Sequence, residues 1–135
     1  MVDTSALAKY VLREEGWEQV GLLLKKKRPV YTVDHILKEV GNAIWKHAAL
    51  RRIIDKDLAT TLYSRLLNLV EAGVIVVEPE SKYLVEAFKI AMEHSITVYD
   101  SLYLAQAQRL GELLTSDEEQ ARVAQKLGIH THLIP

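Results

Sequence analysis

The chain has 135 residues, 49% of them hydrophobic, which predicts one domain over residues 1–135 with a single core. Its 17 basic and 18 acidic residues leave a net charge of -1, which argues against a protein that coats nucleic acid through overall positive charge. The absence of cysteine excludes disulfides and thiolate metal sites, and no apolar run approaches the ~20 residues that cross a bilayer. Because the first residues do not resemble a cationic signal peptide either, we expect a cytoplasmic protein without membrane contact.

The first half of the chain predicts two short strands and four helices. We expect Val2 to end the first strand and Thr4 or Ser5 to cap the helix that follows. Helical periodicity, β-branched residues and caps then predict, in order, a helix over 17–26, a strand over 30–33, a helix that Asp34 caps and a helix over 55–71.

The second half continues the alternation of helices and strands. A fully buried strand over 74–77 is expected first, and then a helix over 82–94 with one apolar side made of Leu84, Val85, Phe88, Ala91 and Met92. A helix from Asp100 to Leu110, a strand over 112–115, a helix capped by Ser116 and a strand over 130–133 complete the chain. Helices that separate short apolar strands predict an α/β fold with a mostly parallel sheet.

Four acidic residues are expected at one edge of this sheet. Asp3 ends the first strand, Asp117 follows the strand over 112–115, and Asp100 begins a helix at the same edge. Glu39 lies in the first turns of the helix after the second strand. Because clustered carboxylates repel one another, such a group implies a bound hard cation, and Mg²⁺ or Mn²⁺ suits oxygen ligands. A divalent ion held in this way can orient a phosphodiester, activate water and stabilise the departing oxygen, so hydrolysis of nucleic acid is the predicted reaction.

Each of these acids also has a simpler interpretation. Asp100 and Asp117 can both be helix caps, which is compatible with a ligand role, and Glu39 taken alone is more often part of a solvated helix face. Asn42, one turn after Glu39, favours the site. The five histidines show no spacing that predicts a metal site, and Tyr99 and Tyr103 are expected to be packing residues.

Four short motifs carry a resemblance to a known family. They are Asp3-Thr4-Ser5-Ala6, Glu39-Val40-Gly41-Asn42, Tyr99-Asp100-Ser101-Leu102-Tyr103 and Thr115-Ser116-Asp117. In their order and separations they resemble the motifs of the PIN-domain ribonucleases across nearly the whole chain. The sequence is most similar to the small single-domain toxins of the VapBC toxin–antitoxin class.

The resemblance implies a PIN-like three-layer α/β/α fold with about five strands and an endoribonuclease site that depends on Mg²⁺ or Mn²⁺. It also implies a homodimer inhibited by a small antitoxin. By carry-over, the catalytic and metal-binding residues are Asp3, Glu39, Asp100 and Asp117. The polar neighbours are Ser5, Asn42 and Thr115, and Lys46, Arg51 and Arg52 are candidate contacts to RNA phosphates.

Two other functions remain open from the sequence. One is a catalytically inactive PIN-like module that dimerises or binds a partner, against which the four acids count. The other is a magnesium-dependent phosphoacceptor signalling domain. That domain requires a phosphorylatable aspartate at the end of a central strand, whereas the strand over 74–77 is followed by Glu78 and Pro79.

Overall fold

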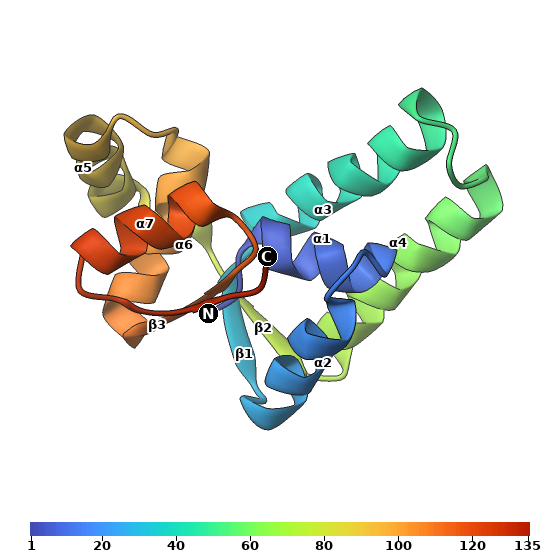
Figure 1. Cartoon of the computed structure of the whole chain (residues 1–135), viewed down its shortest axis with the longest axis horizontal. Coiled ribbons are helices and arrows are strands. Elements are labelled where there is room, and N and C mark those ends of the chain that lie inside the picture. Colours follow the sequence, from blue (N-terminus) through green and yellow to red (C-terminus); the bar gives the residue numbers. More distant parts are fainter.

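The computed structural model describes residues 1–135, and a parallel sheet lies at its centre (Figure 1). Strand β1 (Val30–Val33) pairs with β2 (Ile75–Glu78), and β3 (Glu112–Thr115) pairs with β4 (His130–Leu133), in both cases in parallel. The strands predicted over 30–33, 112–115 and 130–133 are confirmed, and the one predicted over 74–77 is displaced by one residue. The carboxyl ends of all these strands therefore meet at one edge.

Val2 joins the two pairs of strands into one sheet. It forms a parallel bridge with Leu114, and its N–H donates to the carbonyl oxygen of Tyr31 at 3.0 Å. The N–H of Asp3 donates to the carbonyl oxygen of Leu114 at 3.1 Å. The order across the sheet is therefore β2, β1, Val2, β3 and β4. The predicted first strand is reduced to this one bridging residue, with only Met1 ahead of it.

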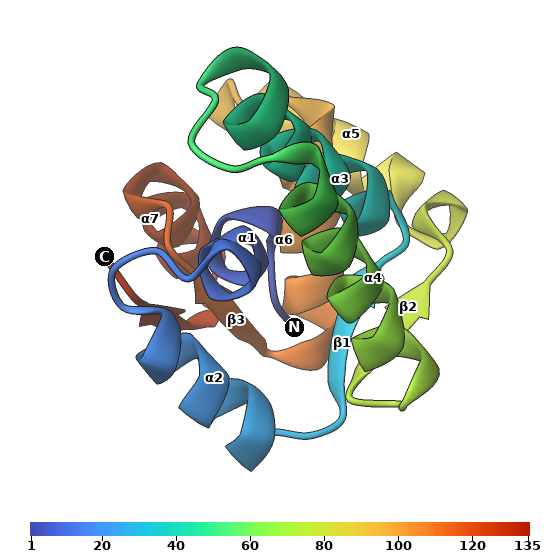
Figure 2. The ribbon, with the colours of Figure 1, turned by 90° about the vertical axis from the view of Figure 1, so that its right-hand side faces the viewer.

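Helices cover both faces of the sheet, which confirms the predicted three-layer α/β/α fold. The layer on the right in Figure 1, which faces the viewer in Figure 2, consists of α1 (Thr4–Leu12), α2 (Trp17–Lys26), α3 (His35–Trp45), the π-helical turn η1 (Lys46–Leu50) and α4 (Lys56–Glu71). The other layer consists of α5 (Leu84–His94), α6 (Val98–Leu110) and α7 (Glu118–Lys126), with the 3₁₀ turn η2 (Glu80–Lys82) before α5. None of these helices has the length and apolar character needed to span a bilayer.

The caps of two helices differ from those predicted. Asp3 caps α1 in place of Thr4 or Ser5, and Thr97 caps α6 in place of Asp100. At α7 the cap is Asp117, one of the two candidates that the sequence offers, and not Ser116. Local sequence does not separate polar candidates that stand only one to three residues apart. Asp34 precedes α3 but makes no capping hydrogen bond, because its Oδ1 accepts from the N–H of Glu80 at 3.0 Å.

One prediction of burial was wrong, and one predicted apolar side lies mostly outside the core. Strand β2 is an edge strand, so after Ile75 its residues are only partly buried. The apolar side of α5 faces outward: Leu84, Val85, Phe88 and Met92 are 45%, 71%, 58% and 70% exposed. The residues that α5 buries are the smaller set Ala87, Ile90 and Ala91, which allow it to pack closely on α6. The periodicity of α5 therefore indicated an apolar face correctly but not the side on which the core lies.

Candidate active site

Asp3 is the buried carboxylate of the acidic edge, with 3% of the residue exposed. Its Oδ1 accepts hydrogen bonds from the Ser5 hydroxyl at 2.7 Å and from the N–H of Ala6 at 3.1 Å. Its Oδ2 accepts from the Thr115 hydroxyl at 2.5 Å. Both oxygens are thus held by groups on two elements, α1 and β3. Ser5 and Thr115 orient this carboxylate, which is the arrangement predicted for them.

Burial raises the pKa of Asp3 from 3.8 to about 6. The hydrogen bonds from Thr115, Ser5 and Ala6 stabilise the ionised form and offset part of this effect, whereas the negative charge of Asp117 raises the pKa further. Removing a carboxylate from water without a cation beside it costs free energy, even when its hydrogen bonds are made. When Asp3 is ionised, no cationic side chain of the protein compensates its negative charge.

Glu39 projects from α3 toward the amino ends of α1 and α6. Its Oε1 accepts from the hydroxyl of Thr4 at 2.8 Å and from that of Tyr103 at 2.5 Å. His35, one turn earlier on α3, places its Nε2 3.6 Å from the same oxygen. The Glu39 side chain is 29% exposed, so one side of it is fixed by hydroxyls and the other is open to solvent.

Asp100 and Asp117 lie at the surface of the same edge, each at the start of a helix. Desolvation by neighbouring groups raises the pKa of Asp100, and the negative charges of Glu39, Asp117 and Glu119 raise it further. The Oδ1 of Asp117 accepts from the N–H of Gln120 at 3.0 Å. The side chain of Gln120 in turn donates to the carbonyl oxygen of Asp100 at 2.9 Å, which ties α6 to α7.

The structure thus brings the four predicted acids to one edge of the sheet, from four different elements. Their donor set is entirely oxygen, which fits Mg²⁺ or Mn²⁺ better than a softer ion. The raised pKa values of Asp3 and Asp100 fit the same group, since a cation would stabilise the ionised forms that burial and mutual repulsion disfavour. Asp3, Glu39, Asp100 and Asp117 would hold the ion; their role stays a prediction.

A cleft of about 460 Å³ opens beside Glu39, between α3 and the start of α6. Lys38 and Lys46 line it together with Asn42 and Tyr99, so two cations face the acidic edge. The ring of Tyr99, which is 60% exposed, stacks on that of His35 with centroids 5.3 Å apart. Asn42 also lies at this cleft. The sequence predicts that Asn42 orients a carboxylate, but it makes no hydrogen bond to Glu39.

Arg51 and Arg52 lie far from this cleft. They follow η1 at the distant tip of the right-hand layer in Figure 1, and twelve residues of helix separate Glu39 from Arg51. At 1.5 Å per residue that is about 18 Å along the helix axis. Of the three predicted phosphate contacts, only Lys46 is placed beside the acidic edge.

Comparison with known proteins decides the family. A model of the PIN domain matches residues 1–126. The chain belongs to the PIN-domain family. It is 34% identical over 122 residues to Ribonuclease VapC3 of Pyrobaculum aerophilum, covering 90% of this chain and 91% of that protein. It is also 28% identical over 136 residues to Exonuclease VapC9 of the same organism, covering 99% and 92%.

Within this PIN domain, the sequence did not single out three residues that the structure places at the site. The sequence predicts a cap at Thr4 and a packing role for Tyr103, and it indicates no role for Lys38. Tyr103 is indeed buried, with 1% of the residue exposed, yet its hydroxyl serves Glu39. Tyr103 lies three residues after Asp100, and residues three apart share a helix face. This spacing is the sequence feature that could have placed Tyr103 near the acids.

Two of the histidines, whose spacing predicts no metal site, lie close to an acidic residue. His130 and His132 lie with Glu112 so that one ligand atom of each is within 4.8 Å of the others. This is the one such group of three histidine, aspartate or glutamate residues in the chain. It belongs to the amino-terminal end of β3, away from the four acids.

Proposed function

We propose that this PIN-domain protein is a metal-dependent endoribonuclease and the toxin of a toxin–antitoxin pair. The observation that carries the proposal is the buried Asp3 carboxylate at the edge where the other three acids lie; burial, and to a smaller extent the charge of Asp117, raise its pKa to about 6. The relative named Ribonuclease VapC3 supports RNA as the substrate and a VapB-type antitoxin as the partner.

In the proposed reaction, the chain positions the substrate and the acids hold the cofactor. Asp3 is fixed by Ser5 and Thr115, and the surface acids Asp100 and Asp117 complete the set together with Glu39. A divalent ion bound there supplies Lewis-acid chemistry, lowering the pKa of water and stabilising charge on the phosphodiester. Glu39 or Asp117 would accept the proton of the attacking water.

The two lysines of the cleft would hold the RNA backbone. Lys38 and Lys46 line the same cleft as Glu39, and phosphate contacts of this kind attract RNA without reading its sequence. Such cations are needed here, because the acidic edge alone would repel a polyanion. RNA is therefore expected to approach along α3.

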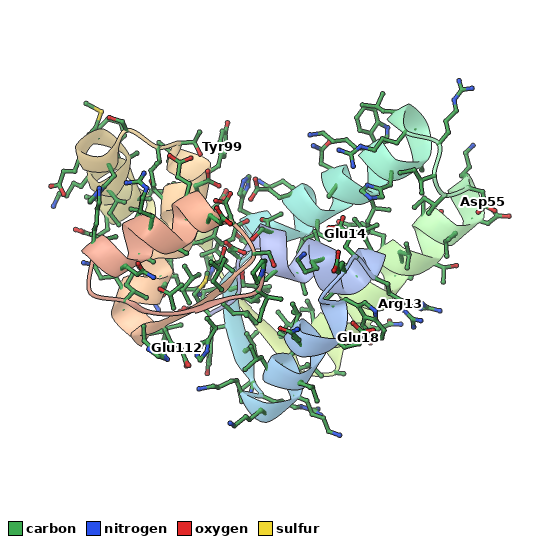
Figure 3. The ribbon with its side chains drawn as sticks, in the orientation of Figure 1. Arg13, Glu14, Glu18, Asp55, Tyr99 and Glu112 are labelled. Carbon is green, nitrogen blue, oxygen red and sulfur yellow. The ribbon has the colours of Figure 1, made fainter.

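Incubation with structured RNA tests the proposal. Cleavage is expected with Mg²⁺ or Mn²⁺ and not with EDTA, and a circular RNA must also be cut if the enzyme is an endonuclease. This substrate separates the proposal from an exonuclease, the activity in the name of the second relative. Asp100→Asn is expected to be inactive and Asp55→Asn, at an exposed helix cap far from the site, fully active (Figure 3). If neither the wild type nor Asp55→Asn cleaves RNA in the presence of a divalent ion, the inactive binding module is favoured.

We further propose that the protein is a homodimer and that two copies meet through α5. Leu84, Val85, Phe88 and Met92 expose a continuous apolar face there, of a kind that monomers seldom leave in water. An isologous contact between two such faces would cover both at once. Phe88→Glu is expected to yield a monomer in sedimentation analysis, and an unchanged mass would contradict the use of α5.

A further inference from the structure

We propose that Glu112, His130 and His132 form a second metal site, for Zn²⁺ or a related borderline ion such as Co²⁺ or Ni²⁺. The site would lie where β3 begins beside β4, at the opposite end of β3 from the acidic residues. Nothing in the reaction proposed above uses these three side chains, and the two proposals do not depend on each other.

The sheet itself places the three ligands on one face. His130 and His132 are two apart on β4, and residues at that spacing point to the same side of a strand. In the parallel register Glu112 lies directly opposite His130. One ligand atom from each residue is within 4.8 Å of the others, and the two imidazole rings meet edge to face with centroids 4.7 Å apart.

The chemistry of these ligands selects the class of ion. Two imidazole nitrogens and one carboxylate oxygen form a donor set that Zn²⁺ accepts, with a fourth position for water. Ligand atoms around a tetrahedral Zn²⁺ at 2.0–2.2 Å stand about 3.3 Å apart. The hydrogen-bonded pair of His132 and Glu112 must therefore open slightly to admit the ion, and any pair near the 4.8 Å limit must close. His130 is exposed and the other two are only partly buried, which leaves room for this movement.

Lys27 is the group that now competes for the carboxylate. Its Nζ lies 2.7 Å from Oε1 of Glu112, and His132 contacts the same oxygen through Nε2. These two partners hold the pKa of Glu112 at about 2, so the carboxylate is ionised and able to bind a cation. The Lys27 side chain is 43% exposed at the end of α2, so it can turn into solvent when an ion enters.

The site is separate from the candidate active site. Glu112 and Thr115 are the first and last residues of β3, which puts the two sites about 10 Å or more apart along the strand. Figure 3 places Glu112 and the cleft residue Tyr99 at opposite ends of the molecule's left-hand layer. A bound ion here would fasten the edge strand β4 to β3, and binding to the folded state alone would stabilise the fold.

Titration of ZnCl₂ into the full chain carrying Asp100→Asn tests the proposal, since this background weakens binding at the acidic edge. Calorimetry is expected to find one Zn²⁺ per chain at the histidines. Adding His130→Ala should lower the affinity at least about tenfold, whereas adding His94→Ala, which removes a histidine outside the cluster, should leave it unchanged. Equal affinities for the His130→Ala variant and its parent would overturn the proposal.

A second variant tests the competing ion pair and does not depend on losing a ligand. Lys27→Met should raise the affinity for Zn²⁺ about twofold to fivefold, because it removes a cation from the shared carboxylate. Zn²⁺ should also raise the melting temperature of the Asp100→Asn chain and not that of its His130→Ala derivative. A lower affinity in Lys27→Met, or equal thermal shifts with and without His130, would show that the ion binds elsewhere.

Discussion

Replacing Asp3 by asparagine should stabilise the metal-free protein at neutral pH while abolishing RNA cleavage. The folded-state pKa of about 6 lies above the ordinary 3.8, so the folded state holds its proton more tightly than the unfolded state does. The contribution of Asp3 to stability is therefore fully present below pH 3.8 and is lost as the pH rises through 6. At about 1.36 kcal/mol per pKa unit, ionised Asp3 costs the fold about 3 kcal/mol at pH 7.5.

The hydrogen bonds around Asp3 allow the amide to be accommodated. Its carbonyl oxygen can accept from Ser5 and Ala6 as Oδ1 does now. Its amide nitrogen can donate to the Thr115 hydroxyl, which then donates to the Ser5 oxygen 3.1 Å away. Allowing for the weaker hydrogen bonds of a neutral group, we expect a net gain between about 1 and 3 kcal/mol.

Urea unfolding in EDTA from pH 4 to pH 8 measures this gain. The difference between Asp3→Asn and wild type should be near zero at pH 4 and grow to its full value by pH 7.5. Asp55→Asn is the matched control, because Asp55 also caps a helix and accepts from Leu58 N–H at 2.7 Å, yet lies far from the other acids. A constant loss of stability in Asp3→Asn at every pH would refute the assignment of an uncompensated charge to this residue.

Three further predictions concern the neighbours of Asp3. Asp100→Asn should abolish cleavage and leave the metal-free chain as stable or more stable in urea, since its pKa is raised by the surrounding acids. Tyr103→Phe should destabilise the fold by about 1 kcal/mol and lower kcat ~10-fold, because Glu39 keeps only the Thr4 hydroxyl. Lys46→Ala should raise KM for RNA and reduce the slope of log affinity against log salt by ~0.7, whereas Arg51→Ala should leave both unchanged.

The fold could be predicted from the sequence because hydrophobic residues recur with different periods in strands and in helices. Alternation of short β-branched runs with amphipathic segments located every strand to within one residue, apart from the single-residue bridge at Val2. It missed the caps of α1 and α6, because the polar candidates stand one to three residues apart and tertiary contacts decide between them. For α5 it predicted an apolar side but not its exposure, because periodicity reveals such a face without showing whether another helix or solvent covers it.

The candidate site was predictable in its residues and not in its contacts. Asp3 and Asp117 follow strands, whereas Asp100 and Glu39 lie in the first turns of α6 and α3, and a parallel sheet gathers such positions at one edge. Which hydroxyl donates to which carboxylate depends on side-chain packing between residues 64 and 112 positions apart, as for Tyr103 with Glu39 and Thr115 with Asp3. The same reason hid Glu112 and His132, whose proximity depends on the register of β3 against β4.

The four carboxylates differ in how firmly the fold holds them. Asp3 is fixed twice, through the backbone hydrogen bonds of Val2 and Asp3 to the flanking strands and through both of its carboxylate oxygens. Asp100 and Asp117 instead lie exposed at the starts of α6 and α7, where the partial positive charge of a helix N-terminus lowers the cost of holding anions together. A site built this way keeps Asp3 in place on the sheet and lets the exposed acids adjust to meet an ion. The rigid position therefore has to be a residue that the sheet buries, and the raised pKa of Asp3 is the consequence.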